Sequence, residues 1–152
     1  MFKKYRQKRD FKKTSEPKGK KTKKKSKKLI FVVQEHQASH LHWDFRLEMD
    51  GVLKSWAVPK GVPQKPGIKR LAVQTEDHPL KYADFQGEIP QGEYGAGQVI
   101  IWDKGSYKLL NKEKDLIDFT LKGKKLRGNY LLFQPQSFKA NNWLIFKKND
   151  KK

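Results

Sequence analysis

The feature that most constrains the fold is a strict alternation of apolar and polar residues in the segment LHWDFRLEMDG. Because successive side chains of a β-strand point to opposite faces, this period of two predicts a strand with one face in the core. The Asp50-Gly51 pair that follows is preferred in two-residue type I′ turns, so the segment predicts a β-hairpin. The core-facing residues are then Leu41, Trp43, Phe45 and Leu47.

The chain from Leu29 onward has the same β character, with β-branched and aromatic residues in short runs between Gly, Pro and Asp. Only the segment LLNKEKDLID has helical spacing, and it is short enough to be a turn with one helical loop. Further hairpin turns are predicted at Asp103-Lys104-Gly105 and between Gly123 and Gly128. Many short antiparallel strands predict a mainly β fold, either a small barrel or a strongly curved sandwich. Strands are predicted near 29–35, 41–49, 52–58, 71–76, 98–102, 106–110, 117–122, 128–134 and 142–148.

Positive charge is concentrated at the N-terminus. Residues 1–28 contain fifteen Lys or Arg and two acidic residues, so fifteen minus two, or thirteen, of the nineteen net positive charges lie there. Such a run repels itself and has little apolar surface to bury, which predicts disorder or ordering on a polyanion. We expect a basic arm at 1–28, a barrel domain at 29–152, and a nucleic acid as partner.

The composition argues against several classes of protein. No apolar run is long enough to span a membrane, and the N-terminus lacks the hydrophobic segment of a signal peptide, so we expect a cytoplasmic, nucleoid-associated protein. The chain has no cysteine and therefore no disulfide or thiolate metal site. Any bound metal must use His, Asp, Glu or water.

The alternating strand carries an unusual polar row, His42, Asp44 and Arg46. His36 ends the preceding predicted strand. If the two strands are neighbours, His36, His42 and Asp44 can converge on one cation and leave positions open for water or substrate. The alternative is that His36 and His40 are surface loop residues and that Asp44 only pairs with Arg46.

His78 is expected in a loop after a strand, where it can act as a general acid or donate a hydrogen bond. In one enzyme hypothesis a metal and Arg46 clamp a phosphate, because the guanidinium matches phosphate oxygens. In another, His42, Asp44 and His78 form the facial triad of a non-haem Fe(II) oxygenase, and Arg46 or Arg70 anchors an oxo-acid. The basic arm favours the phosphate hypothesis.

A third hypothesis is a noncatalytic β-barrel that binds nucleic acid by stacking bases on Trp43, Trp56 or Trp102. It accounts for the positive charge of the chain. It does not account for the row of histidine, aspartate and arginine.

The chain resembles the 3′-phosphoesterase domain of DNA ligase D in three segments: FVVQEHQASHLHWDFRLEMDGVLKSWAVPKGVP, LAVQTEDHPLKYADFQGEIPQGEYGAGQVIIWDKG and YRQKRDFKKTSEP. The resemblance runs through 5–17 and 30–107 and more loosely to about 147. It implies a compact antiparallel β-barrel with long active-site loops and a divalent metal, usually Mn²⁺, with Zn²⁺ or Co²⁺ also compatible. The implied activity removes a terminal ribonucleoside and then the 3′-phosphate, and leaves a 3′-hydroxyl.

The resemblance also implies roles for individual residues. The metal ligands fall on His36, His42 and Asp44, and phosphate contact and catalysis fall on Arg46 and His78. Other positions linked with activity in the family are Arg9, Asp10, Glu16, Gln34, Lys60, Arg70, Glu76 and Tyr82. Residues 5–17 are then expected to dock near the active site, with the Lys-rich 18–28 stretch as a spacer.

The implied substrates are DNA or RNA 3′ ends, in primer-templates with a terminal ribonucleotide or a 3′-phosphate. The implied setting is DNA repair of the non-homologous end-joining type, alongside a separate DNA ligase, a polymerase or a Ku-like end-binding protein. No nucleotidyl-transfer lysine motif or polymerase module fits in the remaining length, so a free-standing monomer is expected.

Overall fold

The computed structural model describes residues 2–9, 11, 16 and 28–149 of the chain. Asp10 and most of the predicted Lys-rich spacer lie outside the described residues. Within them the elements are α1 Lys3–Gln7, β1 Leu29–Gln37, β2 Leu41–Met49, β3 Val52–Val58, β4 Lys69–His78, the 3-10 helix η1 Leu80–Asp84, β5 Gly87–Ile89, β6 Gly97–Glu113, β7 Leu116–Lys122, β8 Arg127–Phe133 and β9 Asn142–Lys147.

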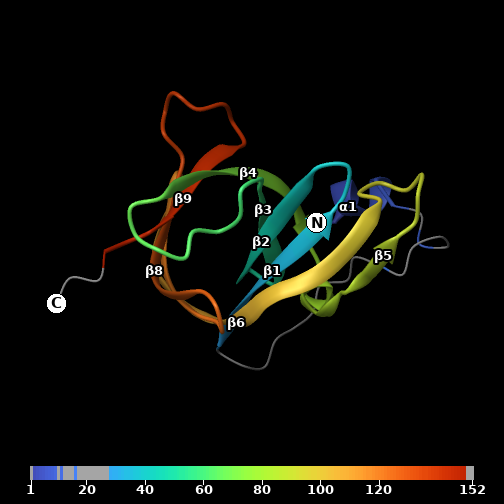
Figure 1. Cartoon of the computed structure of the whole chain (residues 1–152). Helices are drawn as coiled ribbons and strands as arrows, with labels where there is room; N and C mark the ends of the chain where they lie inside the picture. Colours follow the sequence, from blue (N-terminus) through green and yellow to red (C-terminus); the bar gives the residue numbers. More distant parts are fainter. Residues whose placement is uncertain (1, 10, 12–15, 17–27, 150–152) are drawn as a thin grey trace.

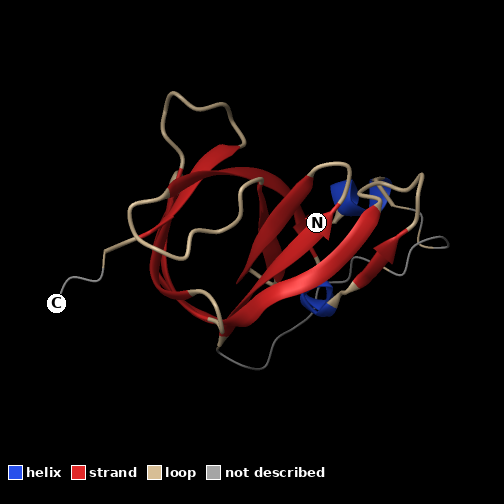
Figure 2. Ribbon diagram, in the orientation of Figure 1, coloured by secondary structure: helices blue, strands red, loops and turns tan. Residues whose placement is uncertain are grey.

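The described strands form one antiparallel sheet in the order β1-β2-β3-β4-β9-β8-β7-β6-β5. A further pairing of β1 with β6 closes eight of them into a barrel, and β5 is an extra strand beside the first part of β6. Figure 1 shows the closed barrel, and Figure 2 shows how little helix accompanies it. The prediction of a mainly β fold with an antiparallel barrel is confirmed.

Alternate residues of the strands fill the barrel interior. Phe45 and Leu47 of β2 are fully buried there, and Phe119 stacks on Phe45 with ring centroids 5.8 Å apart. The predicted hairpin turn is also confirmed, because Asp50 and Gly51 have φ angles of 53° and 81°, as a type I′ turn requires. Leu41 contradicts the prediction. It is 50% exposed, because it is the first residue of β2 at the rim of the barrel.

A second, smaller core lies on the outer face of the barrel. Phe2 and Tyr5 from the α1 region pack there with Tyr82 of η1 and with Val32 and Val99 of the barrel strands. This layer covers part of the outward-facing rows of β1 and β2. The outward-facing polar residues of β2 are therefore buried rather than solvated: Asp44, Arg46 and Glu48 are 8%, 3% and 4% exposed.

Two predicted strands and the turn between them prove to be one long strand, β6. Gly105 does not turn the chain. Instead, its missing side chain lets β6 approach the backbone of Lys122 in β7. Asp103 is buried, and its carboxylate accepts hydrogen bonds from the backbone N–H groups of Lys104, Lys124, Lys125 and Leu126. Asp103 thereby fixes the predicted turn between β7 and β8, which is confirmed.

The segment with helical spacing forms the hairpin between β6 and β7, which turns at Lys114 and Asp115. Pairing with neighbouring strands outweighs a helical period this short.

Strand β4 is longer than predicted, so His78 is its last residue and does not lie in a loop. No helix in the described part of the chain has both the length and the apolar character needed to cross a bilayer.

Candidate active site

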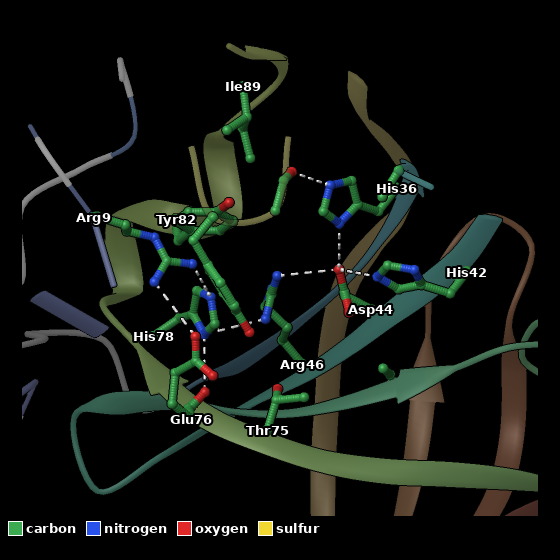
Figure 3. Close-up of a pocket in the computed structure, with 14 residues that line it drawn as sticks. Arg9, His36, His42, Asp44, Arg46, Thr75, Glu76, His78, Tyr82 and Ile89 are labelled. Carbon is green, nitrogen blue, oxygen red and sulfur yellow. Dashed lines mark hydrogen bonds and ion pairs between the residues drawn. The ribbon is translucent and has the colours of Figure 1, made fainter. Parts of the chain in front are cut away.

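Strands β1 and β2 bring the three predicted metal ligands together on the outer face of the barrel. In their antiparallel register His36 lies opposite His42, and Gln34 lies opposite Asp44. His36 Nδ1 and His42 Nε2 lie 3.6 Å and 3.3 Å from the same atom, Asp44 Oδ2 (Figure 3). One donor atom from each side chain lies within 4.8 Å of the other two, so a single ion can reach all three.

Backbone carbonyls hold the remaining ring nitrogens of both histidines. His36 Nε2 lies 2.6 Å from the carbonyl oxygen of Gly95, and His42 Nδ1 lies 2.9 Å from that of His40. A carbonyl can only accept a hydrogen bond, so in the neutral imidazoles these nitrogens carry the protons. The lone pairs then lie on the two nitrogens that face Asp44. Metal-binding histidines are commonly oriented in this way, and the donor set fits a divalent cation.

Arg46 extends the group of three ligands on one side. Its Nη2 lies 3.5 Å from Asp44 Oδ2, and its Nε donates a 2.7 Å hydrogen bond to Gln34 Oε1. The amide nitrogen of Gln34 in turn donates to the carbonyl oxygens of Tyr82 and Phe85, at 2.7 and 3.1 Å. Gln34 therefore fixes the direction in which the Arg46 guanidinium points.

The charges at these ligands are strongly coupled. Burial disfavours the charged form of Asp44, but Arg46 and the two imidazoles outweigh that penalty and hold the pKa of the carboxyl well below its usual range. Burial also opposes protonation of His42, yet the hydrogen bond and charge of Asp44 raise the pKa of that imidazole overall. Asp44 is therefore an anion whose charge the surrounding cations, or a metal, can balance.

His78 lies between two arginines on the other side of the site. Its Nε2 is 3.3 Å from Arg9 Nη2, and its Nδ1 is 3.3 Å from Arg46 Nη1 and 2.9 Å from the carbonyl oxygen of Glu76. Burial, together with the charges of Arg46 and Arg9, holds the pKa of His78 well below its usual value. The resting imidazole is therefore neutral, because it is buried and two cations lie beside it.

The described part of the basic arm contributes directly to this side of the site. Arg9 Nε donates a 2.9 Å hydrogen bond to Glu16 Oε2, and Arg9 Nη1 lies 3.4 Å from Glu76 Oε2. Tyr82 donates a 2.7 Å hydrogen bond to the same Glu16 oxygen. Burial keeps the pKa of Tyr82 well above its usual value. Arg46 opposes this shift, whereas the charge and hydrogen bond of Glu16 add to it.

Most of these side chains surround one cavity of about 300 Å³. Part of its lining was missed in the sequence: Thr75, Tyr94 and the backbone of Gly95 also border the cavity. Gly95 lies in a turn, and its φ of 75° is one that glycine adopts easily. Its carbonyl contact with His36 depends on tertiary structure and leaves no sequence signal. Tyr94 could have been noticed as an aromatic residue within a glycine-rich loop.

Comparison with known proteins identifies the family. The family model described as DNA Ligase D 3′-phosphoesterase domain matches residues 34–134, a segment that contains all three candidate ligands. The chain belongs to this 3′-phosphoesterase family. It is 52% identical over 153 residues to the multifunctional non-homologous end joining protein LigD of Pseudomonas aeruginosa, with 96% of this chain and 18% of that protein covered.

Other LigD proteins are similar over nearly the whole chain. The protein of the same description from Mycolicibacterium smegmatis is 47% identical over 159 residues, with coverage of 97% of this chain and 20% of the relative. The LigD of Mycobacterium tuberculosis strain H37Rv is 44% identical over 152 residues, with 97% and 20% covered. The chain therefore spans about a fifth of the length of these relatives.

Not every residue implied by the family resemblance borders the cavity of this family member. Lys60 and Arg70 lie outside the lining. Arg70 donates hydrogen bonds of 2.7 and 3.0 Å to the carbonyl oxygens of Lys60 and Gly61, and so fastens the loop after β3 to β4. Gln34 and Glu16 also lie outside it, but they hold Arg46 and Arg9 in place.

The two other hypotheses fit the geometry of this family member less well. The described residues place His36, not His78, with His42 and Asp44, whereas both ring nitrogens of His78 face guanidinium groups. For base stacking, Trp56 is only 1% exposed and belongs to the barrel core. Trp43 and Trp102 are partly buried against that core.

Proposed function

We propose that this domain heals 3′ ends of nucleic acids in DNA repair. In a first hydrolysis, water adds to the phosphorus next to a terminal ribonucleoside, the bond to the 5′ oxygen breaks, and a 3′-phosphate remains on the primer. A second hydrolysis releases that phosphate and leaves a 3′-hydroxyl. Membership in the 3′-phosphoesterase family supports this proposal, and the relatives are described as end-joining proteins.

The observation that carries the proposal is the composition of the cavity. One wall holds two imidazoles and a carboxylate at metal-binding distance, and the other holds Arg9, Arg46 and a neutral His78. With a divalent ion held by the first wall, a phosphate placed between these walls would meet positive charge on both sides. Fixed positive charge at the place where negative charge develops is usually the largest single contribution to such catalysis.

His36, His42 and Asp44 would hold the divalent metal, for which we propose Mn²⁺, with Zn²⁺ and Co²⁺ as compatible ions. When bound, the ion supplies Lewis-acid stabilisation of charge on the phosphate oxygens. Arg46 is already oriented by Gln34 and presents its planar guanidinium to the same phosphate.

His78 is our candidate for the group that protonates the leaving oxygen. Its pKa is low in this structure, because it is buried with Arg46 and Arg9 beside it. The negative charge of a bound phosphate would offset both guanidinium groups and favour the protonated imidazole. Arg9 holds His78 from the far side and is itself held by Glu16 and Glu76.

The remaining parts of the proposal concern organisation and partners. We propose that residues 1–28 act as an arm, of which residues 5–17 dock at the site, and that 29–152 form the phosphoesterase barrel. Contacts of Arg9 and Glu16 with the barrel residues Glu76 and Tyr82 support the docking. We further propose a cytoplasmic, nucleoid-associated monomer that works beside a ligase, a polymerase or a Ku-like protein.

A labelled primer-template with a single 3′-terminal ribonucleotide tests the function. With Mn²⁺ we expect release of the ribonucleoside, transient accumulation of the 3′-phosphate primer and then the 3′-hydroxyl primer, identified by mass. A chelator should stop both steps. Binding without turnover in Mn²⁺, Zn²⁺ and Co²⁺ would overturn the esterase proposal and favour the noncatalytic module.

A further inference from the structure

A second depression adjoins the catalytic cavity on the side of the basic arm. It has a volume of about 640 Å³, within the roughly 300–1,000 Å³ usual for small-molecule sites. It shares three residues with the catalytic cavity, namely Thr75, Glu76 and Tyr94. A molecule whose phosphate lies beside Arg46 and His78 can therefore extend across this shared wall into the depression.

The chemistry of the depression suits a nucleoside. Tyr94 presents an aromatic ring, and the residue is 47% exposed although it borders both hollows. Every base has a π-face, so an exposed tyrosine can stack any of them. Gln74 and Asn141 add two side-chain amides, each both donor and acceptor, and a backbone hydrogen bond of 2.7 Å from Gln74 N to Asn141 O keeps these residues together.

The shared wall offers acceptors for sugar hydroxyls. The Glu76 carboxylate receives Lys8 Nζ at 3.1 Å on one oxygen and Arg9 Nη1 at 3.4 Å on the other. Two oxygens provide about four acceptor sites, so these contacts leave capacity for a hydroxyl group. Burial opposes the charged form of Glu76, but hydrogen bonds and the cations Lys8 and Arg9 keep the pKa of this carboxyl below its usual value.

Two contacts hold Tyr94 in place, one with Lys8 of the arm and one through the next residue in its own loop. Lys8 Nζ donates a 3.3 Å hydrogen bond to Tyr94 Oη and lies 4.6 Å from the ring centroid. The next residue, Gly95, accepts the hydrogen bond from His36 that orients this candidate ligand. The ring therefore has a fixed position relative to the candidate metal site, which is what a positioning residue needs.

We infer that this depression is a subsite for the base and sugar of the 3′-terminal nucleoside, the group that leaves in the first hydrolysis. Tyr94 is the platform for the base, and Thr75 and Glu76 face the sugar. This inference rests on the proposed function, because the phosphate must lie in the catalytic cavity. It assigns recognition of the leaving group to residues that hold neither the metal nor the phosphate, although Glu76 also holds Arg9.

Primers with one missing base test the subsite. Stacking contributes roughly 1–3 kcal/mol per base, which is about 5- to 150-fold in an equilibrium constant. We expect kcat/KM to fall at least about five-fold when the terminal ribonucleotide is abasic. An abasic penultimate position should leave the rate unchanged. Equal rates on complete and terminally abasic primers, or a loss confined to the penultimate position, would overturn the inference.

Substitutions at Tyr94 sharpen the test. Tyr94→Leu should raise KM on the complete primer by the same factor, with kcat retained, and should cause no further loss on the terminally abasic primer. Tyr94→Phe keeps the ring and loses only the hydrogen bond from Lys8, so its KM should rise less than that of Tyr94→Leu. Leu110→Ala, at another residue that is 47% exposed, is the matched control and should change nothing. An equal loss on both primers in Tyr94→Leu would indicate a merely structural role and overturn the assignment.

A binding measurement separates this inference from the proposed function. A primer that ends in 2-aminopurine ribonucleotide is bound in the presence of a chelator, and fluorescence quenching reports stacking without turnover. Quenching by the parent chain and by Tyr94→Phe, but not by Tyr94→Leu, is the expected result. Quenching that survives Tyr94→Leu would overturn the subsite. Absence of cleavage of the complete primer in Mn²⁺ would overturn the proposed function, while the quenching result still decides the subsite.

Discussion

The two sides of the active site are assembled in different ways. The ligand side comes from the adjacent strands β1 and β2, and its three residues lie between His36 and Asp44. The guanidinium side joins Arg9 to Glu76 and His78, which lie 67 and 69 residues away along the chain. The first side depends on the register of one hairpin. The guanidinium side depends on docking of the arm on a distant part of the chain. The contacts made there must offset the conformational entropy that is lost when a long loop closes.

This difference predicts that the two sides can be damaged separately. The largest effect is expected at the ligand side. Asp44→Asn should lower the affinity for Mn²⁺ at least about 100-fold, because even residues that only orient a ligand contribute 10- to 100-fold. Calorimetric titration with Mn²⁺ measures this directly.

His40→Ala is the matched control for the ligand side. The backbone carbonyl of His40 accepts the hydrogen bond from His42 Nδ1, and a substitution of the side chain leaves that carbonyl in place. Mn²⁺ affinity should therefore be unchanged. An unchanged affinity in Asp44→Asn, or a large loss in His40→Ala, would show that the ion binds elsewhere.

A smaller and more selective effect is expected from Arg9→Met. Methionine keeps much of the apolar stem but removes a guanidinium that is 5% exposed and pairs with Glu16 and Glu76. Hydrogen bonds to charged groups contribute about 1.5–3 kcal/mol, so kcat/KM should fall roughly 10- to 150-fold. Mn²⁺ affinity should stay that of the parent chain. A parallel loss of Mn²⁺ affinity would mean that the two sides are one cooperative unit.

A second substitution shows whether stability or chemistry causes the loss in Arg9→Met. Glu16→Gln in that background removes the negative charge that Arg9 balances in the parent chain, and a glutamine oxygen can still accept the hydrogen bond from Tyr82. The free energy of unfolding should partly recover, measured in urea, whereas kcat/KM should not. Recovery of both would mean that Arg9 acts only through folding.

The smallest effect concerns pH and the neutral state of His78. Its pKa is lowered in the folded chain, whereas in the unfolded chain the imidazole titrates at about 6.5. Below that pH the unfolded state binds more protons, so the free energy of unfolding falls as pH decreases, by at most about 1.4 kcal/mol per pH unit. His78→Asn should make this dependence shallower between pH 6.5 and 5.

Subtracting the pH dependence of His78→Asn from that of the parent chain gives the contribution of His78 alone. The raised pKa of His42 acts in the opposite direction, stabilising the fold at low pH, but it is present in both chains. Urea unfolding in a chelator excludes any bound ion from the comparison. Parallel pH profiles for the parent chain and His78→Asn would contradict a neutral, buried imidazole.

The sequence predicted the parts of the molecule that depend on local pattern. The alternation in β2 placed His42 and Asp44 on the same face of the sheet, and the Asp50-Gly51 turn joined β2 to β3 in a hairpin. The prediction that His36 joins them needed only the assumption that neighbouring strands pair.

The sequence could not predict features that arise from contacts between distant segments. The Asp103 to Gly105 segment has a typical turn composition, yet its carboxylate binds another turn and its glycine accommodates a neighbouring strand. The depth at which Asp44 and Arg46 are buried also depends on the outer layer of α1, η1 and β5. The contact of Gly95 with His36 is of the same kind.

Strand β2 serves two purposes through alternate residues. Phe45 and Leu47 pack in the barrel interior, while Asp44 and Arg46 face the opposite way and line the cavity. A shift of this strand by one residue would exchange the two sets and would put charged groups into the apolar interior. A chain with this register shift would therefore lose both the stability of its core and the arrangement of its site residues. A stable fold with a misplaced site is not expected.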